Sequence, residues 1–163
     1  MIRRQNLTKE QALQKLKHYC AYQERCHSEV KEKLYSLGLW KKDVEETISL
    51  LIEENYLNEE RFAIQFAGGH FRTKSWGKVK ILYALKQKQV GEYCIKKALS
   101  AIDETDYLKT LEKLARNKWE TLTEEENMYI RRRKLQDYLM QKGYEPDLAA
   151  GVAKEVSLAD GEG

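Results

Sequence analysis

Four side chains near the start of the chain are of types that bind zinc: His18, Cys20, Cys26 and His27. Thiolates and imidazoles at suitable spacing build tetrahedral zinc sites. Here the spacing does not fit, because His18 and Cys20 point to different faces of a helix while Cys26 and His27 are adjacent. We therefore expect no bound metal and no cofactor. Cys94 makes the cysteine count odd, and no CxxC pair occurs. This predicts reduced thiols in a cytoplasmic protein.

Enzymatic chemistry finds no support in the sequence. The chain has no GxxxxGK[S/T] loop, no GxGxxG motif and no HExxH motif. Three histidines and no nucleophile–base pair leave little for hydrolysis. Gly68-Gly69-His70 is interpreted as a loop or a helix end. We predict that the protein is not an enzyme. The polar start MIRRQNLTKE, and the lack of a long apolar run, predict neither a signal peptide nor a membrane span.

A basic block lies in the middle of a chain whose net charge is only +3. Between Phe71 and Gly91 the sequence has no acid, whereas both flanks are acidic. The candidates for contact with an anionic partner are Arg72, Lys74, Lys78, Lys80, Lys86 and Lys88. Phosphates or an acidic protein groove would suit such a face. Backbone N–H groups at the helix start near Gly77 would also favour an anion. The alternative is a solvated lysine face that has no partner.

A second candidate surface is a run of four consecutive basic residues, Arg131, Arg132, Arg133 and Lys134. On a helix these residues cover all sides, so at least one must pack near apolar groups or a carboxylate. Asp137 is spaced to pair with Arg133. The acidic run 124–126 is close enough in sequence to neutralise the basic one. A functional role and structural pairing are both open interpretations of this run.

The elements that carry these residues are predicted to be helices. The chain has one proline and is rich in strong helix formers, which favours an all-α fold. An apolar pattern repeats three times around the anchors Leu34, Leu85 and Leu139. In each repeat, further apolar residues stand four before the anchor and five, ten, fourteen and seventeen after it. Each repeat also has a glycine that is expected near the end of its second helix: Gly38, Gly91 and Gly143. The alternative is a generic helical bundle in which such spacings arise by chance.

The repeats divide the chain. An additional helix is predicted before each pair, over residues 8–21, 58–68 and 106–119, with N-caps at Thr8, Asn58 and Asp106. We therefore predict three three-helix (helix-turn-helix-like) repeats, each with its own small core, over residues 1–56, 57–104 and 105–158. A disordered tail is predicted over 159–163. Trp40 and Trp76, both at turns, are interpreted as closing local cores rather than as anchors for a partner.

The second repeat carries a specific series of residues. It reads Tyr56-Leu57-Asn58-Glu59-Glu60-Arg61-Phe62-Ala63, followed by Arg72, Gly77, Lys80-Ile81, Leu85 and Val90. The first repeat adds Ala12-Leu13, Leu16, Ser28-Glu29 and Leu34. Together these residues resemble the RecX family, although Asn58-Glu59 stands where that family usually has two aspartates. The resemblance covers most of the first two repeats, whereas the third matches only in its apolar pattern. Arg61, Phe62, Ala63 and Gly77 are interpreted as a structural motif, with Arg61 in an ion pair between repeats.

The resemblance to the RecX family implies tandem helical repeats in an elongated, curved arrangement. It also implies a regulatory protein that binds the RecA recombinase filament on DNA and inhibits its assembly, ATPase and recombination activity. Its processes would be homologous recombination, DNA repair and the SOS response. We expect a monomer that does not bind membranes. The alternative is a helix-turn-helix protein that binds DNA directly. The helix starts at Lys41 and Gly91, however, offer no obvious reader of base edges.

Overall fold

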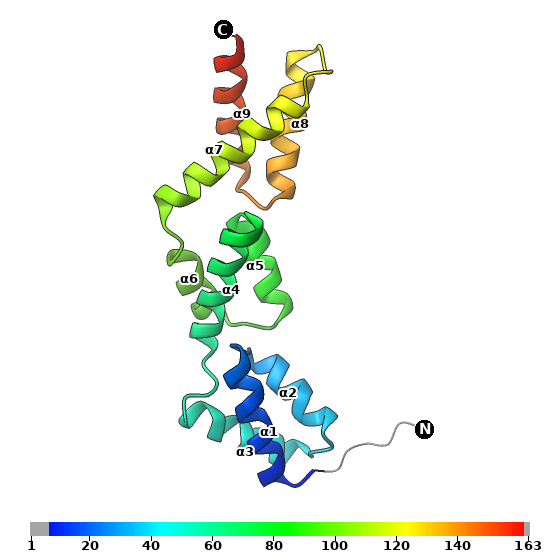
Figure 1. The fold of residues 1–163 in the computed structure, drawn as a ribbon, viewed down its shortest axis with the longest axis vertical. Helices are drawn as coiled ribbons and strands as arrows, with labels where there is room; N and C mark the ends of the chain where they lie inside the picture. The colour runs from blue at the N-terminus through cyan, green and yellow to red at the C-terminus, as the bar shows by residue number, and fades with distance from the viewer. Residues whose placement is uncertain (1–6, 162–163) are drawn as a thin grey trace, which may run out of the picture. The chain divides into compact units, whose positions relative to one another are not determined.

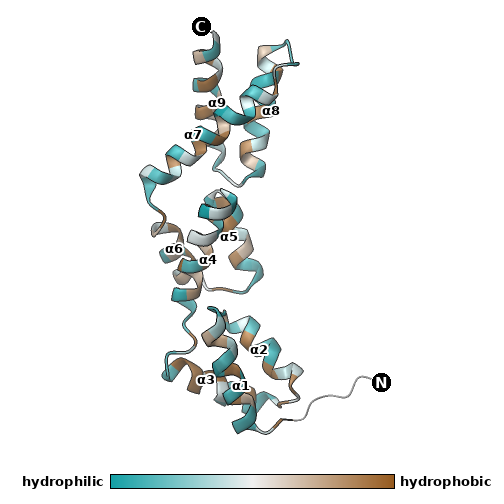
Figure 2. Ribbon diagram, viewed as in Figure 1, coloured by the Kyte–Doolittle hydropathy of each residue, from teal (hydrophilic) through white to brown (hydrophobic). Residues whose placement is uncertain are grey.

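The computed structural model describes residues 7–161, and these residues form helices without any strand (Figure 1). The polar segment 1–6 lies outside the described residues. In chain order the helices are α1 (Lys9–Tyr22), α2 (His27–Ser36), α3 (Lys41–Glu53), α4 (Glu59–Lys74), α5 (Lys78–Gln87), α6 (Glu92–Ser100), α7 (Glu104–Thr121), α8 (Met128–Gln141) and α9 (Pro146–Gly161). The all-α prediction is confirmed. Most helices carry both hydrophobic and hydrophilic residues along their length, as expected for helices with one buried face (Figure 2).

Helix ends agree with the sequence in some places and correct it in others. Thr8 caps α1 as predicted, through a capping box with Gln11. The predicted cap at Asp106 is wrong, because Asp103 caps α7 and accepts a hydrogen bond from the Asp106 backbone N–H. The predicted loop at Gly68-Gly69-His70 is also wrong. These residues lie inside α4, and neither glycine has the positive φ that would end a helix.

The described residues divide into two compact units. One contains the described chain up to Phe66 together with Ala84–Ala98, and the other contains Ala67–Tyr83 and the described chain from Leu99 onward. Helices α4, α5 and α6 therefore contribute residues to both units. This division differs from three repeats that each fold around their own core, and the repeat boundaries at 56/57 and 104/105 remain a prediction. The predicted disordered tail is wrong for residues 159–161, which continue α9. Residues 162 and 163 lie outside the described residues.

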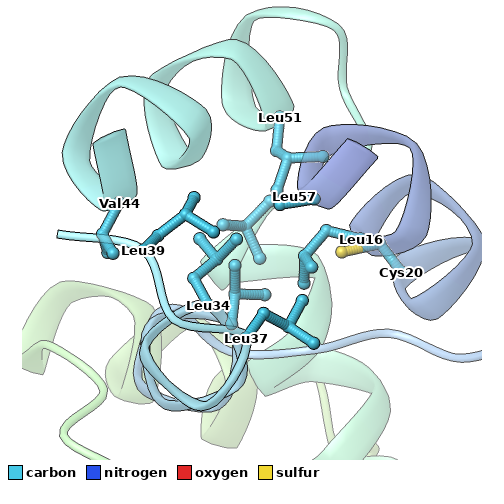
Figure 3. Close-up of a cluster of buried hydrophobic side chains, with 10 residues drawn as sticks. Leu16, Cys20, Leu34, Leu37, Leu39, Val44, Leu51 and Leu57 are labelled. Atoms are coloured by element: carbon cyan, nitrogen blue, oxygen red, sulfur yellow. The ribbon is translucent and has the colours of Figure 1, made fainter. Parts of the chain in front are cut away.

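The first unit has a core of aliphatic side chains from α1, α2 and α3. Leu16 and Cys20 of α1 point toward Leu34 of α2 and Leu51 of α3 (Figure 3). The turn residues Leu37, Leu39 and Leu57 close this core and are almost fully buried. Fully burying a leucine stabilises a protein by about 1.5–3 kcal/mol relative to leaving it exposed. This cluster is therefore the main support for the three helices.

The second unit has its own core between α7, α8 and α9, which pack on one another. Leu111, Ala115 and Trp119 of α7 are buried, as are Leu135 and Leu139 of α8. The small residues Ala149, Ala153 and Ser157 form the buried face of α9. Small side chains let α9 approach its neighbours closely, so this core is filled mainly by α7 and α8.

The predicted repeat is seen in burial, with a correction in its third helix. The anchors and the residues four before, five after and ten after them are buried in all three repeats. At offset fourteen the prediction fails in two repeats, because Thr47 and Ala98, one residue earlier, are buried instead of Ile48 and Leu99. In a helix of 3.6 residues per turn, residues three or four apart lie on the same face. Spacing alone therefore does not decide whether the residue at offset thirteen or the one at offset fourteen is buried.

The left-handed turn of each repeat lies four residues after the anchor. Gly38 and Gly143 occupy it with φ of 90° and 101°, as expected for glycine. In the second repeat this position is Gln89, with φ of 61°, and not the predicted Gly91. Gly91 instead lies just before α6, where its carbonyl accepts a hydrogen bond from Ile95. The prediction for Gly91 is therefore wrong, and a non-glycine residue makes this turn.

Gly77 forms a backbone junction in the second unit. Its N–H donates to the Lys142 carbonyl at 2.9 Å, and the Val79 N–H donates to the Gly143 carbonyl at 2.9 Å. A Cβ placed on Gly77 would overlap the backbone of Gly143 and Tyr144. A Cβ on Gly143 would overlap Lys80, and the positive φ of Gly143 also disfavours a side chain. The start of α5 and the α8–α9 turn thus meet without room for a side chain at either glycine.

Two buried tyrosines complete this junction. The Tyr107 hydroxyl accepts a hydrogen bond from the Lys78 N–H at 2.9 Å and donates one to the Glu145 carboxylate. Burial, reinforced by the bond to Glu145, raises the pKa of Tyr107, so the phenol stays protonated. The Tyr144 hydroxyl donates to the Ser75 carbonyl at 2.9 Å. The ring centroids of Tyr107 and Tyr144 lie 5.1 Å apart, so the two side chains pack against each other beside the junction.

The remaining residues of the predicted structural motif lie in the first unit. Phe62 and Ala63 are buried. Arg61 forms an ion pair with Glu24, which lies in the first predicted repeat, and donates to the side chain and carbonyl of Asn55. Arg61 thereby ties the start of α4 to the segment after α1 and the turn after α3.

Replacing Gly77 by alanine tests the junction. The Gly77→Ala change is expected to lower the free energy of unfolding by about 3 kcal/mol, because the added methyl must displace backbone atoms that are held by two hydrogen bonds. Urea denaturation followed by circular dichroism measures this change.

The matched control is Gly69→Ala, inside α4, where a Cβ has no neighbour within 4 Å. Alanine favours the helix interior over glycine, so this variant should be as stable as the parent or up to about 1 kcal/mol more stable. Equal stability of the two variants would contradict the close approach at Gly77.

Candidate anion-binding surfaces

The structure divides the predicted basic face between the two compact units. Arg72, Lys74, Lys78 and Lys80 belong to the second unit, whereas Lys86 and Lys88 belong to the first. Arg72, Lys74 and Lys86 are exposed, and the other three are partly buried.

Two of these lysines have acidic partners that are distant in sequence. Lys78 lies 3.5 Å from Glu104 of α7, and its ammonium lies 4.7 Å from the centre of the Tyr107 ring. Lys88 lies 3.9 Å from Glu29 of α2, and the Ser28 hydroxyl donates to its carbonyl at 2.7 Å. The sequence between Phe71 and Gly91 contains no acid, but the fold brings acidic residues from other helices to two of its lysines. Lys78 and Lys88 are therefore weaker candidates for a partner.

Lys74 and Lys80 are arranged around Trp76. Their ammonium groups lie 5.2 Å and 4.8 Å from the centre of the indole ring. His70 lies beside the same ring, at 4.6 Å between centroids. Lys142 adds a third ammonium, which donates to the Lys74 carbonyl at 2.9 Å. We call Lys74, Trp76, Lys80 and Lys142 the Trp76 cluster.

The Trp76 cluster holds positive charge without an acidic partner. None of its three lysines lies within ion-pair distance of a carboxylate among the described residues. Ring contacts of this kind stabilise a cation by about 0.5–1 kcal/mol at exposed sites while leaving its charge in place. The interpretation of Trp76 as part of a local core is only partly right, since the half-buried ring also supports lysines. Lys142 was not foreseen, although it directly precedes Gly143 of the turn.

The predicted anion site at the helix start near Gly77 is wrong. The N–H groups of Gly77, Lys78 and Val79 donate to Lys142, Tyr107 and Gly143, respectively. An anion at this helix start would need donors that the junction already uses. Any anion bound here must therefore be held by lysine side chains.

The second basic run is largely engaged in the fold. Arg131 is buried, with its guanidinium 3.8 Å from the centre of the Trp119 ring, and it donates to the Trp119 carbonyl at 2.7 Å and to Asp160 at 3.2 Å. Arg132 donates to Ser157, and Lys134 pairs with Glu125 at 3.2 Å.

The interpretation of structural pairing is therefore right for Arg131, Arg132 and Lys134. The predicted pair between Arg133 and Asp137 is not among the ion pairs of the described residues, and Arg133 is exposed. Arg133 is thus the member of this run whose charge is most available to a partner.

The interpretation of Trp40 as a core residue is wrong. Its side chain is 81% exposed at the start of α3, because the neighbouring Leu39 rather than Trp40 enters the core.

Three of the side chains considered as zinc ligands have other environments in the fold. Cys20 and Cys26 are buried, and His27 pairs with Glu59 at 2.9 Å. Burial raises the pKa of Cys20 to about 11, so its thiol stays protonated at neutral pH. Within residues 7–161, no three His, Cys, Asp or Glu side chains are grouped to hold a metal.

Comparison with known proteins identifies the family. A family model described as the second three-helix domain of RecX matches residues 58–99, and one for the third three-helix domain of RecX matches residues 104–152. Together these two models match more than half of the chain. The chain belongs to the RecX family.

Relatives within the RecX family are named regulatory proteins. "Regulatory protein RecX" of Clostridium perfringens strain 13 is 32% identical over 134 residues, which cover 82% of this chain and 62% of that protein. "Regulatory protein RecX" of Thermotoga petrophila is 28% identical over 158 residues, which cover 94% of this chain and 89% of that protein. This RecX-family chain thus matches about three fifths of the length of its clostridial relatives.

Solved structures agree with the RecX fold. The crystal structure of RecX from Lactobacillus salivarius superimposes with a TM-score of 0.84 at 21% identity, covering 92% of this chain and 97% of that one. This similarity confirms a helical repeat fold. Among the described residues, no helix is long and apolar enough to cross a membrane.

The contrast between two adjacent arginines is testable. The Arg131→Ala change should lower the free energy of unfolding by about 2 kcal/mol, because it removes a buried stack on Trp119 and two hydrogen bonds. Arg133→Ala, at an exposed position, should change it by less than about 0.5 kcal/mol. Urea denaturation of both variants is the measurement. A large loss from Arg133→Ala would show that it, too, is structural.

Proposed function

We propose that this RecX-family chain binds the filament that the RecA recombinase forms on DNA and limits its assembly, ATP hydrolysis and recombination activity. Membership of a family whose relatives are named regulatory proteins supports this proposal. The observation that carries it is the Trp76 cluster, in which Lys74, Lys80 and Lys142 hold positive charge without an acidic partner. A filament on DNA presents both phosphates and acidic side chains to such a cluster.

The geometry of the cluster favours binding over catalysis. The Trp76 ring limits the movement of two lysine side chains, so less rotamer entropy is lost when they meet an anion. The junction at Gly77 fixes the backbone beneath them. Arg72 and Arg133, both exposed, are secondary contact candidates in the same unit, and Lys86 is the corresponding candidate in the first unit.

Limiting the filament requires a difference in affinity. A protein that binds assembled and free RecA equally well would not shift the assembly equilibrium. We therefore expect the chain, acting as a monomer, to oppose the extension of the RecA filament or the arrangement of RecA subunits that hydrolyses ATP. Direct binding of DNA by helix-turn-helix readout is the alternative. It predicts tight binding to bare duplex DNA.

The proposal is tested with RecA-dependent ATP hydrolysis on single-stranded DNA. Adding the chain should lower the steady-state rate, and the Lys74→Gln/Lys80→Gln double variant should require a several-fold higher concentration for the same effect. Glutamine keeps the Cβ of Lys80 that contacts the α8–α9 turn, so the fold should be retained. The dependence of filament binding on salt should also become shallower, with the slope falling by about one for each lysine that no longer neutralises a phosphate.

The charge-matched control is Lys109→Gln/Lys113→Gln, which removes two exposed lysines from α7 of the same unit. This control should act like the parent protein. No effect of the parent protein on RecA would refute the proposed function. Equal loss in both double variants would refute the role of the Trp76 cluster and leave only a general charge effect.

A further inference from the structure

Trp40 is the exposed tryptophan of this chain, and its ring is open to a ligand. The Trp76 ring carries two lysines and His70, and the buried Trp119 ring carries Arg131. Among the described residues, no cation or aromatic ring lies over Trp40, whose side chain is 81% exposed. An indole of this size in water is unfavourable for the isolated protein, because its apolar surface stays hydrated.

The fold does not need an aromatic side chain at this position. Trp40 directly precedes α3, and its side chain makes no capping hydrogen bond to the helix. Its backbone carbonyl accepts a hydrogen bond from the Val44 N–H, which any residue could do. The equivalent position of the second repeat, six residues after the anchor, is Gly91, where even a Cβ would have no neighbour within 4 Å. In the third repeat it is Glu145. The repeat thus tolerates very different residues here.

Two lysines follow Trp40 directly. Lys41 and Lys42 are both exposed. Among the described residues, the only ion pair that either forms is that of Lys41 with Glu45, at 3.9 Å between two exposed side chains. Such a pair contributes little and is easily exchanged for another anion. The second and third repeats have Glu92 and Pro146 where the first has Lys41. At this position of the repeat, an exposed aromatic ring followed directly by two exposed lysines therefore occurs only in the first repeat.

We propose that Trp40, Lys41 and Lys42 form a stacking site for unpaired bases of single-stranded nucleic acid. The flat ring would stack on one base, and the two ammonium groups would contact the adjacent phosphates. Stacking needs only the open face of one ring. A protein hot spot or a membrane surface would need apolar neighbours around the tryptophan. Here Leu37 and Leu39 are buried, and the residues that follow are charged.

This inference does not depend on the proposed function, because it concerns bare nucleic acid. It also differs from reading of duplex DNA, since the bases inside a duplex cannot stack on a side chain without being unpaired. Trp40 itself provides the signal for the test. In a Trp76→Phe variant the emission of exposed tryptophan comes from Trp40, since Trp119 is buried.

The experiment titrates the Trp76→Phe variant with oligothymidylate and with a duplex of the same length. Oligothymidylate should quench the emission of Trp40, and the duplex should have little effect. In the Trp76-containing protein, Trp40→Ala should weaken oligothymidylate binding by about tenfold or more, and Trp40→Phe should retain part of it. Lys41→Gln/Lys42→Gln should lower the salt dependence of binding.

The matched control is Tyr22→Ala, which removes another aromatic side chain of the first unit that is 84% exposed. This variant should bind oligothymidylate like the parent protein. Unchanged binding by Trp40→Ala would overturn the proposal, as would equal quenching by duplex and single strand. Loss of RecA inhibition in Trp40→Ala without loss of oligothymidylate binding would also overturn it, because Trp40 would then contact protein.

Discussion

The backbone junction between Gly77 and the α8–α9 turn is the constraint on which much of the second unit depends. Two N–H donors of one segment meet two carbonyls of the other, and neither glycine has room for a side chain. The buried Tyr107 and Tyr144 then add hydrogen bonds to the same segments. This arrangement fixes Trp76, just before α5, and Lys80, in the first turn of α5. It also uses the donors that a helix terminus would otherwise offer to an anion.

Many of the basic residues in this chain are engaged by other parts of the fold, so fewer of them can bind a ligand than the sequence suggests. Lys78, Lys88 and Lys134 have carboxylate partners, and Arg131 is buried against an indole. These cations support the fold and are poor candidates for a ligand. The lysines of the Trp76 cluster differ, because their neighbours are a ring and a carbonyl that leave the charge uncompensated. Tryptophan thus has two roles in this unit: one ring buries a cation, and the other presents cations.

The sequence predicts the helices and their buried anchors better than the turns, the ion-pair partners and the exposure of single side chains. Helix formers and apolar spacing were sufficient for the all-α class, and the anchors Leu34, Leu85 and Leu139 are buried as expected. The turn at Gln89 was missed because glycine is favoured at positive φ but not required there. The partners of Lys78 and Lys88 were missed because Glu104 and Glu29 are distant in the chain. The exposure of Trp40 was missed because hydrophobicity predicts burial only on average.

Three helices, α4, α5 and α6, each contribute residues to both compact units. The polypeptide leaves the first unit after Phe66, returns at Ala84 and leaves again after Ala98. A truncation at a predicted repeat boundary, between residues 56 and 57 or between 104 and 105, would therefore divide the residues of one unit between two fragments. Fragments cut in this way would lose part of a core as well as a surface. Point substitutions of exposed residues in the intact chain are accordingly the sound way to assign a role to each repeat.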